Sequence, residues 1–180
     1  HVVSSAALYG GTVNQLKHFL RKMSVQLTWV DPDEPDAWKK AVRDNTKAFF
    51  GETIGNPKGD LLDIEAVAEV AHRNGVPLIV DNTIATPFLI RPFEFGADVV
   101  VHSATKYLGG HGTAIAGLIV DGGTFDWTGG KHPGFTTPDP TYNGVVYASL
   151  GAPAFALKAR VQLLRDLGPA ISPFNAFLVV

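Results

Sequence analysis

Short apolar runs alternate with amphipathic segments along most of the chain. Five of these runs are bounded by turn residues and rich in β-branched or aromatic side chains, which predicts strands at 25–30, 47–52, 77–81, 98–103 and 113–121. Several are apolar on successive positions instead of every second one. That pattern is typical of strands whose sheet is covered on both faces.

The segments between the runs have helical spacing. Residues 63–75 place four apolar side chains on one helix face, with Asp63 as a candidate N-cap and Gly75 as a candidate C-cap. Segments 12–23 and 35–45 follow the same spacing. Strands alternating with helices predict right-handed crossovers and a mostly parallel sheet. We therefore expect an α/β fold with three layers, α/β/α.

The pattern changes after residue 121. Residues 122–144 are dense in Gly, Pro, Thr and Asp, and a connection of this length is usually functional or mobile. Two further helices are predicted, near 151–166 and from 173 onward.

The composition limits the classes of protein to which the chain can belong. The 180 residues are 46% hydrophobic, enough for one domain or one piece of a larger protein, and the formal net charge of -2 includes no basic stripe. We expect no nucleic-acid partner. No run approaches the roughly 20 apolar residues that cross a bilayer, and no signal peptide opens the chain, so we expect no membrane partner either. The absence of cysteine fits a cytoplasmic location.

Polar side chains follow three of the predicted strands. They are Asn56, Asp81, and the group Ser103, Thr105 and Lys106. In open α/β sheets, ligands bind outside the carboxyl ends of the strands. Taken singly, Lys106 could simply begin a surface loop and Asp81 could be a turn residue.

Taken together, Lys106 and Asp81 indicate a specific chemistry. A lysine amine aimed at an aldehyde and a carboxylate aimed at a pyridine nitrogen are the two protein groups that pyridoxal phosphate requires. The neighbouring hydroxyls of Ser103 and Thr105 could donate hydrogen bonds to its phosphate. The six histidines show no metal-ligand spacing, so we predict no metal site.

Four motifs carry a family resemblance across essentially the whole chain. "LYGGT" (8–12), "ETIGNP" (52–57), "VDNTIATP" (80–87) and "SATKYLGGHGTAIAG" (103–117) resemble those of the pyridoxal-phosphate-dependent enzymes of cysteine and methionine metabolism. The resemblance implies the aspartate-aminotransferase-like large domain of fold type I. Residues 1–180 would be an incomplete part of that domain, without its N-terminal segment and without the C-terminal small domain.

The resemblance also implies roles for single residues. Lys106 matches the lysine that bonds to the cofactor and is catalytic, Asp81 matches the partner of the pyridine nitrogen, and Tyr9 matches a catalytic tyrosine that stacks on the ring. Without its motif, Tyr9 would read as the aromatic start of an amphipathic helix.

The same resemblance implies the remaining contacts with the cofactor. Ser103 and Thr105 match phosphate ligands, Asn56 would bond the ring hydroxyl, and Thr83 would lie close to the ring. The glycines at 109, 110 and 112 would permit close backbone approach or positive φ, although a plain flexible turn would look the same.

Within the family, "ETIGNP", the loop after Lys106 and the stretch "HPGFTTPDPTYNG" (132–144) are more similar to O-acetylhomoserine sulfhydrylases than to cystathionine synthases and lyases. This likeness implies a γ-replacement in which an amino-acid substrate, O-acetyl-L-homoserine, reacts with sulfide. Homo-oligomers built as dimers of dimers are also implied. Three alternatives stay open: a cystathionine γ-synthase, a cystathionine or methionine γ-lyase, and a folded fragment that binds no cofactor.

Overall fold

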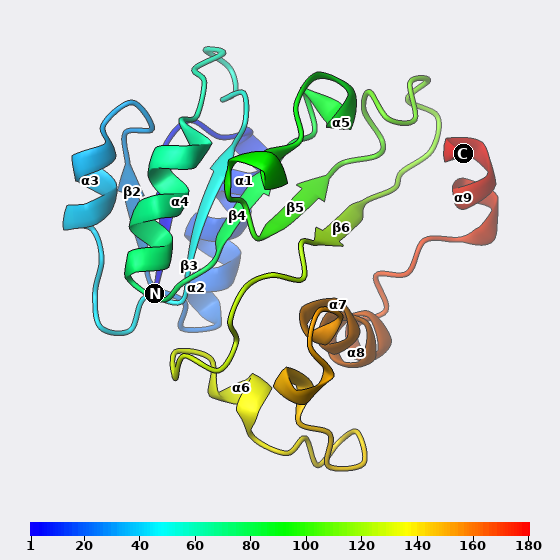
Figure 1. Cartoon of the computed structure of the whole chain (residues 1–180). Helices are drawn as coiled ribbons and strands as arrows, with labels where there is room; N and C mark the ends of the chain where they lie inside the picture. Colours follow the sequence, from blue (N-terminus) through cyan, green and yellow to red (C-terminus); the bar gives the residue numbers. More distant parts are fainter.

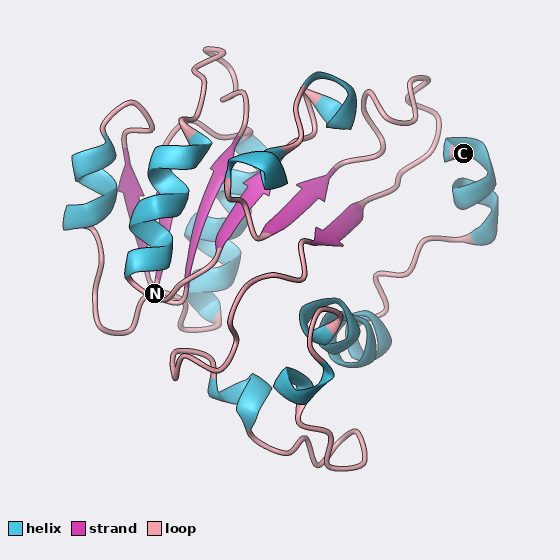
Figure 2. Cartoon of the chain, in the orientation of Figure 1, coloured by secondary structure: helices cyan, strands magenta, loops and turns pink.

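A computed structural model describes residues 1–180 and contains one six-stranded sheet. The strands are β1 (Val2–Ser5), β2 (Leu27–Val30), β3 (Ala48–Glu52), β4 (Leu78–Asp81), β5 (Val99–His102) and β6 (Leu118–Asp121). Their order is β2-β1-β3-β4-β5-β6, with β1 to β5 parallel and β6 antiparallel to β5 (Figures 1 and 2). The mostly parallel sheet predicted from the sequence is confirmed.

Strand β1 was not predicted, although it pairs with both β2 and β3. Two of its four residues, Ser4 and Ser5, are polar, so it does not form an apolar run. Both serines are buried, because the strand lies inside the sheet.

Helical segments connect the strands. They are α1 (Gly10–Asn14), η1 (Gln15–Phe19), α2 (Leu20–Lys22), α3 (Pro35–Lys40), α4 (Ile64–Arg73), α5 (Thr86–Leu89), η2 (Pro92–Phe95), α6 (Pro133–Thr136), η3 (Tyr147–Leu150), α7 (Ala154–Lys158), η4 (Ala159–Leu164), α8 (Arg165–Leu167) and α9 (Pro173–Val179). Figure 1 shows α3 and α4 on one face of the sheet and the stretch from α1 to α2 on the other. This gives the three layers that the sequence predicts.

Helix α4 agrees closely with its sequence pattern. The side chain of Asp63 accepts a hydrogen bond from the main-chain N–H of Ala66 at 3.0 Å, as an N-cap does. Gly75 follows the helix with φ of +64°, a conformation that favours glycine. The predicted helix over 12–23 is instead interrupted by the π-helical turn η1, which shifts the following side chains around the axis.

The main core lies between α3, α4 and one face of the sheet. Trp38 of α3 is fully buried and its ring centroid lies 5.4 Å from that of Phe49 on β3. Val67 of α4 is also fully buried against this face, whereas Ile79, on the opposite face of β4, is half-buried. The core therefore holds the strands at fixed positions from the α3–α4 side.

The stretch after residue 121 forms a second, smaller core. Trp127, Phe135 and Tyr147 pack with Ala154 and Val161 of the following helical segments. The rings of Trp127 and Phe135 stack with centroids 4.2 Å apart. The long connection is thus organised by its aromatic side chains. Across the whole chain, none of the helices combines the length and apolar character needed to cross a bilayer.

Candidate active site

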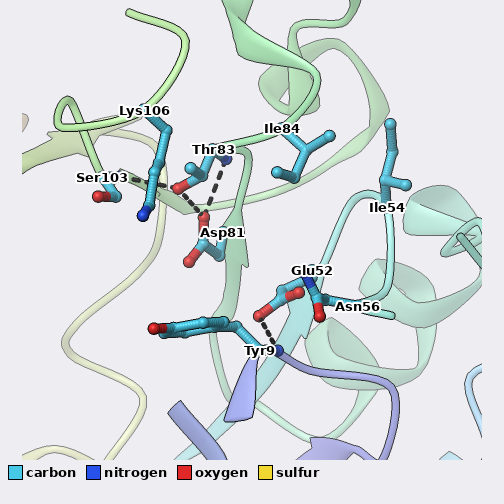
Figure 3. A pocket seen from close by; sticks show the side chains of 9 residues that line it. All are labelled: Tyr9, Glu52, Ile54, Asn56, Asp81, Thr83, Ile84, Ser103 and Lys106. Carbon is cyan, nitrogen blue, oxygen red and sulfur yellow. Dashed lines mark hydrogen bonds between the residues drawn. The ribbon is translucent and has the colours of Figure 1, made fainter. Parts of the chain in front are cut away.

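A pocket of about 190 Å³ opens at the carboxyl edge of the parallel strands (Figure 3). Strands β3, β4 and β5 end side by side at this edge, and the segment after β1 also reaches it. The residues that line the pocket are Tyr9, Glu52, Ile54, Asn56, Asp81, Thr83, Ile84, Ser103 and Lys106. Six of the seven residues predicted for the site are therefore brought together from four separate segments.

Asp81 ends β4 and is oriented by Thr83. The main-chain N–H of Thr83 donates to Oδ1 of Asp81 at 2.9 Å, and the Thr83 hydroxyl donates to the same oxygen at 2.5 Å. The hydroxyl of Thr83 also accepts the main-chain N–H of Ser103 at 2.7 Å. These bonds join the ends of β4 and β5 and leave Oδ2 of Asp81 facing the pocket (Figure 3).

Lys106 lies on a tight turn after β5. Its main-chain N–H donates to the carbonyl of Ser103 at 3.1 Å, and the N–H of Gly109 donates to the carbonyl of Ala104 at 2.9 Å. A Cβ at Gly109 would lie 2.6 Å from the Ala104 oxygen, so this turn requires glycine there. The side chain of Lys106 points from the turn into the pocket (Figure 3).

Tyr9 and Asn56 complete the side of the pocket opposite Lys106. The ring of Tyr9 forms a flat wall that faces Asp81 and Lys106 (Figure 3). Tyr9 is 55% exposed, so its ring presents a broad face to the pocket opening. Asn56 lies on the loop after β3, beside Glu52 (Figure 3).

Thr105 is the one predicted site residue that does not line the pocket. Its hydroxyl donates to the carbonyl of Ala116 at 3.2 Å and accepts the main-chain N–H of the same residue at 3.0 Å. A hydroxyl has only one hydrogen to donate. To donate a hydrogen bond to a phosphate, the Thr105 hydroxyl would have to give up its bond to the carbonyl of Ala116. The role of Thr105 as a phosphate ligand therefore stays a prediction.

Glu52 is a pocket residue that the sequence reasoning missed. It is the last residue of β3, pairs in register with Asp81, and is 7% exposed. Burial, together with the nearby Asp81 carboxylate, raises the pKa of Glu52 to about 7, against the opposing effect of the main-chain N–H groups of Tyr9 and Asn56. The strand-end rule that selected Asp81 would have selected Glu52 at the end of "AFFGE" as well.

The pocket fits a flat aromatic aldehyde with a protonated ring nitrogen. A free carboxylate oxygen and a primary amine face the same space, and an aromatic ring forms one wall. These are the groups through which proteins bind pyridoxal phosphate. No set of three or more His, Cys, Asp or Glu side chains is placed to hold a metal ion.

Comparisons with known proteins agree with this chemistry. The sequence model of the family described as "Cys/Met metabolism PLP-dependent enzyme" matches residues 1–180. The O-acetyl-L-homoserine sulfhydrylase of Corynebacterium glutamicum is 55% identical over 100% of this chain and 43% of its own length.

Two solved structures share the fold. A putative O-acetylhomoserine (thiol)-lyase from Campylobacter jejuni, which carries a pyridoxyl-lysine phosphate, has a TM-score of 0.95 and 37% identity over 99% of this chain and 44% of its own. Cystathionine γ-lyase from Lactobacillus plantarum has a TM-score of 0.80 and 29% identity over 99% of this chain and 39% of its own. The chain thus spans less than half the length of each of these relatives.

Proposed function

Since the chain belongs to the Cys/Met metabolism PLP-dependent enzymes, we propose that it supplies the cofactor-binding pocket of an O-acetyl-L-homoserine sulfhydrylase. Such an enzyme converts O-acetyl-L-homoserine and sulfide into L-homocysteine and acetate. The observation that carries the proposal is the pocket in which Lys106, Asp81 and Tyr9 face one another. Residues 1–180 would form part of the large, cofactor-binding domain.

Three residues would hold the ring of pyridoxal phosphate. Lys106 would bond through Nζ to the aldehyde carbon, and Oδ2 of Asp81 would accept a hydrogen bond from the protonated pyridine nitrogen. The ring of Tyr9 would stack on the face of the cofactor. When bound, the cofactor supplies an electron sink that stabilises negative charge on the substrate carbon next to the amine.

Four further residues would hold the edges of the cofactor. Ser103 and Thr105 would contact the phosphate, and Asn56 would bond the ring hydroxyl. The positions of Ser103 and Asn56 on the pocket wall support their roles. Thr83 would lie close to the ring while it keeps Asp81 oriented.

Lys106 would also move protons on the substrate. As a free amine, its Nζ would lie beside the reacting carbons of the substrate, on the short turn after β5. It could then take the proton from Cα and later act at Cβ, in the manner of a general base. Asp81 would keep the ring nitrogen protonated through its hydrogen bond.

A γ-lyase is the second candidate, because the Lactobacillus plantarum enzyme has the same fold. Product formation by the intact enzyme separates the two. Purified enzyme would be given O-acetyl-L-homoserine with sulfide, O-acetyl-L-homoserine with cysteine, or cystathionine alone. We expect homocysteine from the first mixture to form fastest. Faster release of 2-oxobutyrate from cystathionine would instead identify a lyase, and faster cystathionine formation a synthase.

The proposal extends to assembly and location. The protein would act as a homo-oligomer, a dimer of dimers, in the cytoplasm, with small-molecule partners only. The lack of cysteine fits the cytoplasmic location. Size-exclusion chromatography with light scattering would test the assembly, and a monomer would contradict it.

A further inference from the structure

Glu52 connects the end of β3 to the segment that carries Tyr9. Its Oε1 accepts a hydrogen bond from the main-chain N–H of Tyr9 at 2.7 Å. The two residues are 43 positions apart in the sequence. Because Glu52 is 7% exposed and ends a strand held on both sides by neighbours, its carboxyl is a fixed point in the pocket wall.

Tyr9 itself has few other restraints. It precedes α1, whose N-terminus has no side-chain cap, and the residue is 55% exposed. Its hydroxyl has no hydrogen-bond partner within the chain. The main-chain bond to Glu52 is therefore a principal link between the tyrosine and the sheet.

Gly11 supplies a second restraint, on the ring. A Cβ at position 11 would lie 2.5 Å from Cε1 of Tyr9, closer than non-bonded carbon atoms approach. The ring thus lies against the glycine, in space that any side chain would fill. Glu52 holds the main chain of Tyr9, and Gly11 leaves room for its ring.

We propose that Glu52 is a positioning residue of this active site, which fixes the main chain of Tyr9 so that the Tyr9 ring stays opposite Asp81 and Lys106. The inference rests on the proposed function, because the position of the ring matters for catalysis only if pyridoxal phosphate lies between these groups. The role is mechanical and needs a hydrogen-bond acceptor at position 52, not a charge. Glutamine retains such an acceptor, whereas alanine removes it.

The test uses the full-length protein with Glu52→Ala and Glu52→Gln. Hydrogen exchange of the peptide that contains Tyr9 is measured by mass spectrometry without cofactor, and the dissociation constant of pyridoxal phosphate is measured separately. We expect Glu52→Ala to speed exchange and to weaken cofactor binding about 5-fold, the effect of losing one hydrogen bond. Glu52→Gln should restore both values to within about 3-fold of wild type.

A double-mutant cycle separates positioning from a general structural effect. If Glu52 acts through Tyr9, then Glu52→Ala should weaken cofactor binding less than about 2-fold in a Tyr9→Ala background. An undiminished effect in that background would overturn the proposal. So would a Glu52→Gln variant with normal exchange at Tyr9 and cofactor binding as weak as that of Glu52→Ala.

The variant Gly11→Ala tests the position of the Tyr9 ring while Glu52 stays intact. It should displace the Tyr9 ring and weaken cofactor binding, and unchanged binding would count against the importance of the ring position. If Glu52→Ala does not fold, Glu52→Gln still tests the proposal, because cofactor binding weakened well beyond about 3-fold with normal exchange at Tyr9 would overturn it. Should the wild-type protein fail to bind pyridoxal phosphate, the proposed function fails, while exchange at Tyr9 still reports whether Glu52 holds this segment.

Discussion

Thr83 gives both its main-chain N–H and its hydroxyl to one oxygen of Asp81, which leaves the second carboxylate oxygen toward the pocket. The same hydroxyl accepts the main-chain N–H of Ser103, so a single side chain orients Asp81 and ties it to the segment that leads to Lys106. A carboxylate held in this way needs no rearrangement to meet a cationic ring nitrogen. Preorganised charge of this kind is a large contributor to catalysis.

Replacing Thr83 should therefore slow the enzyme. Thr83→Val keeps the shape but removes the hydroxyl, so Asp81 loses a donor and the N–H of Ser103 loses its acceptor. We expect kcat/KM to fall about 10- to 100-fold, the range for losing a hydrogen bond to a charged group. Thr83→Ser keeps the hydroxyl and should stay close to wild type; equal rates for the Val and Ser variants would contradict this role.

Removing the amine of Lys106 should abolish covalent attachment of pyridoxal phosphate. Lys106→Ala in the intact enzyme should lose the visible absorption band of the bound cofactor, and borohydride should no longer fix a pyridoxyl group to this turn. Lys17→Ala, on the exposed η1 turn, is the matched control and should keep both. A wild-type spectrum from the Lys106 variant would rule out the assigned chemistry.

The raised pKa of Glu52 predicts a pH-dependent stability. Burial raises this pKa from 4.5 to about 7 in the folded protein, so between these values the folded state binds more protons than the unfolded state. The Glu52 carboxyl therefore makes the free energy of unfolding fall as the pH rises from 4.5 to about 7. The glutamine of Glu52→Gln does not titrate. The free energy of unfolding of this variant should therefore rise relative to that of wild type between about pH 5 and about pH 8.

Urea denaturation of both proteins at the two pH values measures this difference. The Asp81 carboxylate lies near Glu52 in both proteins, so part of the difference reports the repulsion between these two groups. A constant difference between wild type and Glu52→Gln would show that Glu52 does not titrate in this range.

The main core depends on Trp38. It is fully buried against Phe49, so Trp38→Ala should destabilise the protein by about 3–5 kcal/mol. Trp38→Phe should cost clearly less, because it keeps an aromatic ring and the indole N–H has no partner to lose. Denaturation midpoints of the two variants check the order, and equal losses would contradict the packing described.

The second core contains a hydrogen-bonded carboxylate. The hydroxyl of Tyr147 donates to Oδ2 of Asp139 at 2.6 Å and, with Thr141 and Gln162, holds the pKa of Asp139 below its usual range. Because the pKa of Asp139 is lowered in the folded protein, its carboxylate stabilises the fold at pH values above 3.8. This contribution is lost as the pH falls below that value. Tyr147→Phe should thus lower the unfolding midpoint at neutral pH and have a smaller effect near pH 3 or below.

Tyr142→Phe is the control for this prediction. Tyr142 packs against the same aromatic cluster, and its hydroxyl makes no hydrogen bond within the chain. We expect its midpoint to stay near that of wild type at both pH values. An equal loss in the two variants would assign the effect to packing instead of the Asp139 bond.

Patterns within single segments were readable from the sequence. Five of the six strands, helix α4 with its Asp63 cap, and the mostly parallel sheet all follow from the local order of apolar and polar residues. Strand β1 escaped prediction because Ser4 and Ser5 are buried by their place within the sheet and not by their own polarity. The resemblance carried by four short motifs indicated the family that the comparisons then showed.

By itself, the sequence determined which residue types end the strands, and hence that an amine and a carboxylate would meet at one edge of the sheet. Only the tertiary structure decided that Glu52 stands in register with Asp81 and holds Tyr9, and that the hydroxyl of Thr105 turns to Ala116. Strand register and contacts between distant segments depend on how the whole sheet packs. Polar side chains then take the partners that this packing brings within reach, and no local pattern records them.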